Sequence, residues 1–267
     1  MAPESDRHRA PARPDALSLG LARGSLRCSV DREAALLFLG YRGQSVDREL
    51  LDRLEAAASL CESENTPRFA WRTAEIDPAP SQGGGQIVLA GCDLALPGES
   101  IGRHLRDAGQ AALLAVTLGH ACQRTAERLQ ASSPVDALLY DACASSLTEE
   151  AANAAHLLLA DAAREAGLEA RARFSPGYGD LPLDVHPAFL RALDAERELG
   201  MYADASNLLQ PAKSITAVIG LFPRGCADGG DDVNSCPGCA AFCYCNFREA
   251  GTTCRASRQP ERARAAN

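Results

Sequence analysis

Apolar residues recur at intervals of three and four over much of the chain, the spacing that places them on one side of a helix. The pattern predicts helices over 32–41, 46–61, 100–108, 119–130, 134–166 and 187–199. The longest of them is rich in alanine, which has the highest intrinsic helix propensity. We therefore expect it to be central in the fold.

Short runs with the alternation or the apolar character of strands lie between these helices. They cover 68–73, 87–89, 111–117, 169–174 and 214–221, and we expect the first two to pair as antiparallel neighbours. Strands and helices do not alternate regularly, so the sequence predicts the α+β class. The expected architecture is a single domain with a mostly antiparallel twisted sheet and flanking helices.

Composition limits the classes of partner. The chain has 267 residues, of which 46% are hydrophobic and 23% charged, with a net charge of -8. The acidic balance and the lack of a dense basic stripe within the predicted fold argue against a nucleic-acid partner. No apolar run approaches the roughly 20 residues that a membrane-spanning helix needs, so we expect a soluble protein that does not bind membranes.

Composition shifts also suggest the domain boundaries. We expect a flexible leader at 1–25, the folded domain at 26–223, a Cys-rich metal-binding tail at 224–254 and a disordered tail at 255–267. The leader lacks the apolar core of a secretion signal, which predicts a cytoplasmic protein.

Common site motifs are missing from the sequence. There is no Gly-x-Gly-x-x-Gly after a strand and no phosphate-binding Gly-Lys-Ser signature, and the five histidines form no pair at metal-ligand spacing. Cys143 and Ser145 lie on a predicted helix without an evident partner base, so a covalent nucleophile finds no support.

One loop combines side chains suited to a ligand. Residues 173–183 read Arg-Phe-Ser-Pro-Gly-Tyr-Gly-Asp-Leu-Pro-Leu. The Pro-Gly turn restricts the loop and lets its backbone approach a ligand. Arg173 can bind a carboxylate through two hydrogen bonds, and Tyr178 can lie against a flat or cationic group. The set suits an amino-acid-like or nucleoside-like ligand; the alternative is a structural turn with a solvated arginine.

The motif Arg-x-x-x-Gly-Tyr, followed by a helix and then by Pro-Ala-Lys-Ser-Ile-Thr at 211–216, carries a family resemblance. It resembles the S-adenosylmethionine-binding activation domain of cobalamin-dependent methionine synthase, and in particular the free-standing proteins related to it. The similarity extends upstream through 115–119 and 141–149, so it covers roughly residues 30–222.

The resemblance implies a set of site residues. The cofactor-binding residues would be Glu149, Arg173, Phe174, Gly177 and Tyr178. Tyr178 would also be catalytic, beside the reacting centre. Without the resemblance, Glu149 would be interpreted as a solvated acid on a helix surface. A further acidic ligand that the family draws from an N-terminal segment has no match in this sequence.

The function implied is reductive reactivation of a cobalamin-dependent methyltransferase. The chain would present S-adenosylmethionine to a cobalamin carried by a partner, either the methyltransferase itself or another corrinoid protein, with a flavodoxin or ferredoxin as electron donor. Two alternatives stay open: a module that senses S-adenosylmethionine without catalysis, and an iron-sulfur electron carrier that serves a corrinoid protein.

Six of the eleven cysteines fall between Cys226 and Cys254. The pair Cys236-Pro-Gly-Cys239 can hold one ion, and further nearby thiolates could complete a site for zinc or an iron-sulfur cluster. Redox-active thiols and disulfides are the alternatives, although disulfides persist poorly in a reducing cytosol. The tails of the free-standing relatives suggest Cys236, Cys239 and Cys245 as ligands, and the sequence does not choose the fourth.

We predict that the purified protein contains zinc or iron bound by this tail. A tail so poor in apolar residues has little other reason to fold, and metal binding would supply the ordering energy. Elemental analysis of anaerobically purified protein checks this, with Cys236→Ser and Cys239→Ser expected to lose the metal. If the wild-type protein contains neither metal, the metal prediction is wrong, and redox-active thiols or disulfides become the favoured interpretation.

Overall fold

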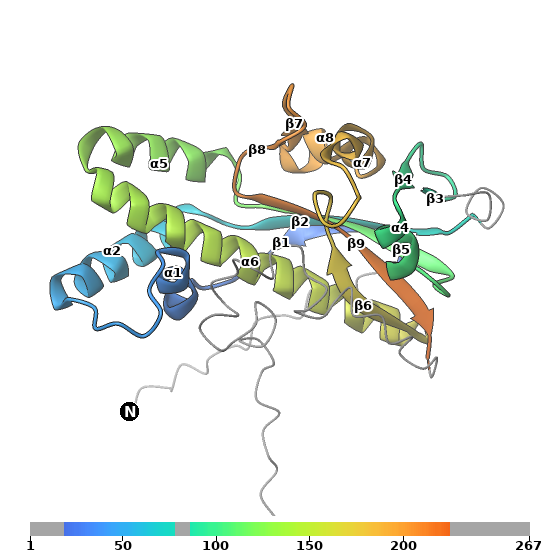
Figure 1. The fold of residues 1–267 in the computed structure, drawn as a ribbon, viewed down its shortest axis with the longest axis horizontal. Coiled ribbons are helices and arrows are strands. Elements are labelled where there is room, and N and C mark those ends of the chain that lie inside the picture. Colours follow the sequence, from blue (N-terminus) through green and yellow to red (C-terminus); the bar gives the residue numbers. More distant parts are fainter. Residues whose placement is uncertain (1–18, 78–85, 225–267) are drawn as a thin grey trace, which may run out of the picture.

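The centre of the fold is a five-stranded sheet in which every strand is antiparallel to its neighbours (Figure 1). The computed structural model describes residues 19–77 and 86–224. In spatial order the strands are β1 (Leu21–Ser25), β2 (Arg68–Glu75), β5 (Gln110–Thr117), β9 (Ser214–Pro223) and β6 (Leu168–Phe174). The predicted α+β fold, a single domain with an antiparallel sheet, is confirmed.

Two small strand pairs and seven helices complete the described fold. The strand pairs are β3 (Gln86–Val88) with β4 (Ala95–Pro97), and β7 (Tyr202–Ala203) with β8 (Leu209–Gln210). The helices are α1 (Arg32–Phe38), α2 (Arg48–Glu64), α4 (Glu99–His104), α5 (His120–Ser132), α6 (Pro134–Glu165), α7 (His186–Ala192) and α8 (Ala195–Leu199), with a 3-10 turn at Leu183–Val185.

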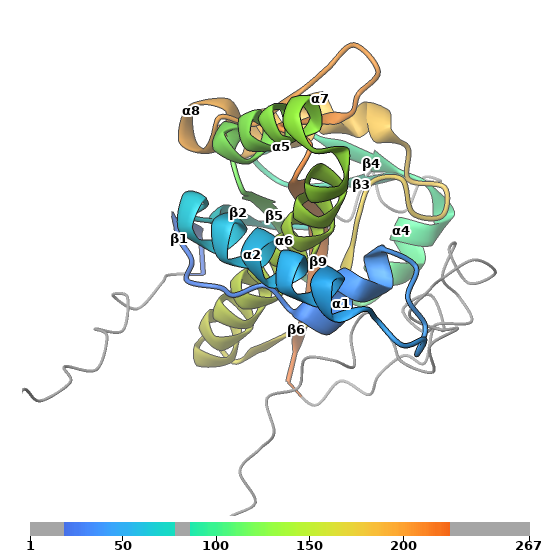
Figure 2. The ribbon, with the colours of Figure 1, turned by 90° about the vertical axis from the view of Figure 1, so that its left-hand side faces the viewer.

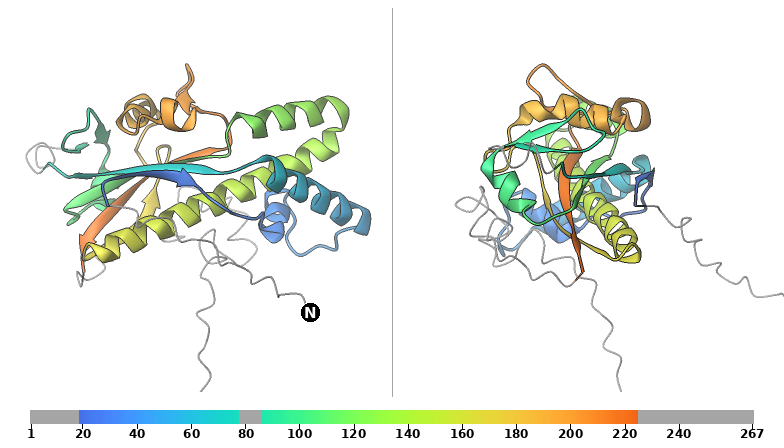
Figure 3. Two further views of the ribbon diagram at one scale, coloured as in Figure 1. Left: turned by 180° about the vertical axis from the view of Figure 1, so that it is seen from behind. Right: turned by 90° about the vertical axis from the view of Figure 1, so that its right-hand side faces the viewer.

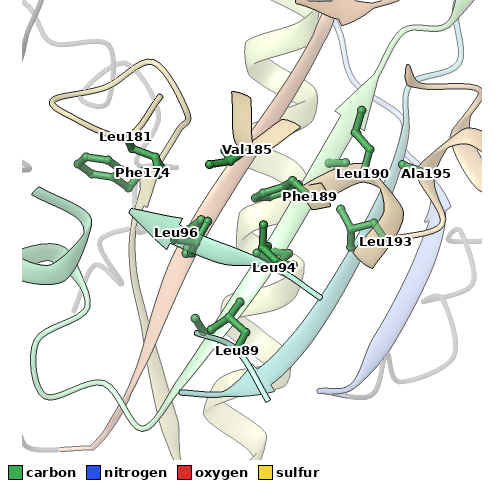
Figure 4. Close-up of a cluster of buried hydrophobic side chains, with 14 of the residues drawn as sticks. Leu89, Leu94, Leu96, Phe174, Leu181, Val185, Phe189, Leu190, Leu193 and Ala195 are labelled. Carbon is green, nitrogen blue, oxygen red and sulfur yellow. The ribbon is translucent and has the colours of Figure 1, made fainter. Parts of the chain in front are cut away.

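Both faces of the sheet are covered, which accounts for the uninterrupted apolar run of β5. Successive side chains of a strand point to opposite faces. Leu113 accordingly packs with α4, α7, α8 and the β3–β4 pair, while Leu114 packs against α6 (Figure 1). Figure 4 shows the first of these two cores, in which Phe189 and Leu193 of the α7 region approach Leu94 and Leu96.

Helix α6 takes part in two layers. Its C-terminal half lies against the sheet with small side chains such as Ala151 and Ala155, which allow a close approach. Its N-terminal half forms a helical bundle with α1, α2 and α5, which faces the viewer in Figure 2. Ser133 caps its start and Pro134 occupies its first turn. No helix in the described ranges is long and apolar enough to cross a membrane.

The structure corrects the predicted partner of the strand at 87–89. We expected it beside 68–73, but β3 pairs with β4, and only one isolated bridge, Ile76 to Leu89, joins this region to the end of β2. The reason is competition: β1 and β5 already occupy the two edges of β2.

Three predicted boundaries also change. Strand β1 lies inside the stretch assigned to a flexible leader, so the described fold begins before residue 26. The predicted helix 187–199 is two helices, because Asp194 adopts a left-handed conformation with φ 51° between α7 and α8. The helix predicted at 100–108 ends at His104.

Candidate functional site

A β-bulge in β6 turns Arg173 toward α6. Ala170 pairs with Leu221 and Arg173 pairs with Ile219, so β6 has one residue more than β9 between these two pairs. An extra residue reverses the face that the following side chains take. Ala170 packs on the α6 side, and strict alternation would send Phe174 there too. With the bulge, Arg173 meets α6 and Phe174 enters the opposite core.

The Arg173 guanidinium contacts two polar side chains of α6. Its Nη2 donates to Oδ1 of Asn153 at 3.0 Å and lies 3.4 Å from Oε2 of Glu149. The side chains of Arg173 and Glu149 are 18% and 36% exposed, so the pair lies between protein and solvent. The structure therefore brings together the guanidinium and the carboxylate that the sequence analysis singled out.

Asn153 is a site residue that the sequence analysis missed. Because its Oδ1 accepts a hydrogen bond from Arg173, the orientation of the amide is determined. Its Nδ2 is buried and has no hydrogen-bond partner among the described residues. A buried donor without an acceptor costs about 1–3 kcal/mol, so a ligand oxygen at this point would be stabilising.

Asn153 belongs to a polar stripe along α6. Four polar side chains follow one another there at four-residue spacing, namely Asp141, Ser145, Glu149 and Asn153. Lys213, the only lysine of the chain, contacts the two residues at the N-terminal end of the stripe. Its Nζ lies 2.8 Å from Oδ1 of Asp141 and 2.8 Å from Oγ of Ser145. The stripe is thus bounded by one cation from β6 and another from the segment before β9.

The sheet is incomplete beside this stripe. Strand β6 pairs with β9 only from Val218 onward, where Phe174 is its partner. On that edge, Ser214–Ala217 have no neighbouring strand in the part of the chain that the structure describes. An edge without a strand neighbour leaves backbone groups for a ligand. The loop that follows Phe174 leaves the sheet at this point.

Hydrogen bonds within the loop 175–182 hold its shape. Gly177 N donates to Leu181 O, Tyr178 N to Ser175 O and Leu181 N to Tyr178 O. These amides are therefore used inside the loop and do not offer donors to a ligand. Gly177 has φ 91°, and a Cβ there would lie 3.2 Å from the Leu183 side chain, so the turn requires glycine.

Asp180 docks the loop on the first turn of α4. Its two carboxylate oxygens accept from the amides of Ser100 at 2.9 Å and Glu99 at 2.7 Å. The helix has no capping side chain of its own, since Gly98 precedes it. The hydrogen bond from Ser100, helped by that from Glu99, lowers the pKa of Asp180. The contact is close: a Cβ at Gly179 would lie 2.6 Å from Oγ of Ser100.

The two aromatic residues of the predicted site differ in exposure. Phe174 is 3% exposed and packs against His104 and other core residues, so only its main chain remains for the ligand contact that was predicted. Tyr178 is 51% exposed and meets Phe174 edge to face, with ring centroids 6.1 Å apart. Tyr178 therefore packs on Phe174 and keeps about half of its side chain open to solvent.

Other reactive side chains have structural roles. Burial raises the pKa of the Cys143 thiol to about 12, so it stays protonated near neutral pH. Ser145 binds Lys213, whose ammonium is paired with Asp141 and so donates to the hydroxyl. His186 donates from Nδ1 to a backbone carbonyl, and burial lowers its pKa and favours the neutral ring.

The predicted metal ligands Cys236, Cys239 and Cys245 lie outside the described residues. Within the described ranges, no group of three or more His, Cys, Asp or Glu side chains is arranged to hold a metal ion.

No family model matches the chain, and no curated protein matches it. The solved structures do give a match. The fold is similar to that of the MetH reactivation domain. The crystal structure of this domain bound to AdoHcy aligns with 79% of this chain and 81% of its own, at a TM-score of 0.57 and 16% identity. At this identity the likeness is one of fold.

We predict that Asp180→Ala lowers the free energy of unfolding, because loss of a helix cap costs about 0.5–2 kcal/mol. The Asp180 pKa is lower in the folded protein than in the unfolded chain. Its contribution is therefore complete above about pH 4, the range of an unfolded aspartate, and is lost as the pH falls through the folded pKa. Denaturant unfolding at pH 7 and pH 3.5 checks both points.

Asp184→Ala is the matched control, since Asp184 is an exposed carboxylate nearby without a cap to make. Equal stability of the two variants at pH 7 would show that the contact of Asp180 with α4 contributes nothing.

Proposed function

We propose that this chain binds S-adenosylmethionine at the Arg173 site and presents its methyl group to a cobalamin carried by a partner protein. The process served would be reductive reactivation of a cobalamin-dependent methyltransferase of the methionine synthase type. The observation that carries the proposal is the grouping of Arg173, Glu149 and Asn153 beside the loop 175–182. The likeness of fold to the MetH reactivation domain, a domain bound to AdoHcy, supports it.

The chemistry of the site fits the methyl donor. S-adenosylmethionine has a carboxylate, an ammonium group, a sulfonium and ribose hydroxyls. Arg173 would bind the carboxylate, and the partly exposed Glu149 would accept hydrogen bonds from the ammonium group or the ribose. The buried Nδ2 of Asn153 would donate to a carboxylate or ribose oxygen and so lose its desolvation penalty.

Tyr178 would shape the geometry of transfer. Its ring is fixed on one side by Phe174 and exposed on the other, where a partner could approach. When bound, S-adenosylmethionine supplies an electrophilic methyl group on sulfur. The chain would keep that methyl in line with the acceptor, because holding two reactants in the reacting geometry removes much of the entropic barrier.

The proposal requires partners. The sequence has no Asp-x-His-x-x-Gly cobalamin-ligand signature, so in this proposal the cobalamin arrives on a methyltransferase or another corrinoid protein. Reduction of cobalt(II) before methylation requires an electron donor such as a flavodoxin or ferredoxin.

We predict that Arg173→Ala weakens binding of S-adenosylmethionine by about ten- to a hundredfold, because hydrogen bonds to charged groups contribute about 1.5–3 kcal/mol. Isothermal titration calorimetry on the full chain measures this. Arg164→Ala is the control, since Arg164 is an exposed arginine paired with Asp161 near the far end of α6. If wild type and Arg173→Ala bind alike, the arginine assignment is wrong; if neither binds, the proposed function is wrong.

We predict that Tyr178→Phe slows methyl transfer more than it weakens binding, since the ring is kept and only the hydroxyl is lost. Single-turnover methylation of a partner's reduced cobalamin, with binding measured in parallel, tests the split. Equal methyl-transfer rates for the wild type and Tyr178→Phe would show that the hydroxyl has no part in the reaction. A wild-type protein that binds S-adenosylmethionine but leaves the cobalamin spectrum unchanged would instead be a sensing module.

A further inference from the structure

An arginine-lined hollow lies at the opposite edge of the sheet from Arg173. It has a volume of about 340 Å³ and lies between the two strands β1 and β2 and the turn that joins α7 to α8. Figure 3 (left) shows this side, with the blue edge strand below the orange helices. The lining residues are Leu21, Arg23, Ala70, Arg72, Arg191, Ala192, Leu193, Asp194, Arg197 and Glu198.

The floor of the hollow is set by strand register. Leu21 pairs with Arg72, and Arg23 pairs with Ala70. Residues directly opposite each other in a sheet share a face, and alternate residues of one strand do so too. All four side chains therefore rise on the face that α7 and α8 cover, so the sheet contributes two guanidinium groups to one wall.

Charge in the hollow is unbalanced. Its two carboxylates are both occupied: Glu198 pairs with Arg23 at 2.7 Å and with Arg197 at 2.8 Å, and Asp194 also pairs with Arg197. Neither Arg72 nor Arg191 has a carboxylate partner among the described residues. Two positive charges thus remain in one hollow of a chain whose net charge is -8.

Arg72 is held in place for a ligand. Its Nη1 donates to Ala192 O at 3.2 Å and its Nη2 to Gly91 O at 2.9 Å. These carbonyls orient the half-buried guanidinium but bring no opposite charge, and a guanidinium has five N–H groups to share. Arg191 lines the same hollow and has no hydrogen-bond or ion-pair partner within the described ranges.

We propose that this hollow binds a small dianion of the phosphate-monoester class. Two uncompensated guanidinium groups match the charge of a phosphate, whose oxygens accept paired N–H donors. The volume lies in the range of small-molecule sites and exceeds the needs of a bare phosphate ion, which favours a phosphate carried on a small organic group. The exposed side chain of Leu21 offers apolar contact to that group. The inference does not depend on the function proposed for the Arg173 site.

Calorimetric titration of the full chain at constant ionic strength tests the proposal. The probes are glycerol 3-phosphate, inorganic phosphate and succinate. We expect saturable binding of glycerol 3-phosphate, weaker binding of inorganic phosphate and the weakest binding of succinate. Inorganic phosphate binding as tightly as the ester would overturn the assignment of an organic group, and no saturable binding of either phosphate would overturn the site.

Variants locate the site. Arg191→Met removes an exposed guanidinium without a structural contact and is expected to weaken glycerol 3-phosphate binding at least tenfold. Arg72→Met should weaken it further, although it also removes two contacts that brace the fold, so Arg191→Met is the decisive variant. The control is Arg124→Met, an exposed arginine of α5. If Arg191→Met and Arg124→Met weaken binding equally, the anion is attracted by the overall charge of the protein and not by this hollow, and the proposal is overturned.

The same variants distinguish a macromolecular ligand. If neither phosphate binds but an acidic electron-transfer protein loses affinity on Arg191→Met, the hollow is a protein-docking surface and the small-anion proposal is wrong. Binding of S-adenosylmethionine should be unchanged in Arg191→Met, so failure here and failure of the Arg173 proposal give different results.

Discussion

The extra residue in β6 decides which side of the sheet each part of the candidate site meets. Without it, Arg173 would point away from α6 and Phe174 would displace it against the helix. With it, the guanidinium reaches Asn153 and the aromatic ring fills the core below α4 and α7. Gly220 lies opposite the bulge, where a Cβ would come within 2.6 Å of the Phe222 ring. Glycine on β9 is thus part of the same constraint.

Helix α6 presents polar side chains to the arginine that the bulge positions. Small residues let a helix lie close to a sheet, and Ala151 and Ala155 fulfil this role in α6. The neighbouring polar stripe then stands at the border of the sheet, within reach of β6 and of the start of β9. Because the N-terminal half of α6 is fixed in the bundle with α2 and α5, the stripe cannot shift without disturbing a second core.

Local patterns predicted the elements that are long and strongly periodic, such as α6, or uniformly apolar, such as β5. They failed where a distant segment decides the outcome. The strand at 87–89 could not be assigned a partner without knowing that β1 closes the edge of β2. The docking of Asp180 on α4 joins residues 80 and 81 positions apart, and its only local signal is Gly98, a helix start without a capping side chain.

The site itself divides in the same way. Arg173 and Tyr178 were singled out by the side chains and turn residues of their loop. Glu149 came from family resemblance alone, since a glutamate on an alanine-rich helix has no distinguishing pattern of its own. Asn153 was missed because its role depends on a contact between distant residues. Its Oδ1 accepts a hydrogen bond from Arg173, and its buried Nδ2 is left without an acceptor. The bulge was invisible because it is a property of two strands, and neither strand breaks its alternation in a way that sequence alone reveals.

The two candidate sites lie at opposite edges of the sheet, and distance limits how they can influence each other. Four strand spacings separate β1 from β6, which is about 19 Å. That is more than twice the Debye length of about 8 Å at physiological ionic strength, so exposed charges at one edge are screened from the other. Any coupling must therefore travel through packing. One continuous route is the core shared by α4, α7 and α8, in which Phe174, at the start of the Arg173 loop, and Leu193, beside the arginine hollow, belong to the same cluster. The core on the α6 side is another, since it joins Ala22 of β1 to Ala170 of β6.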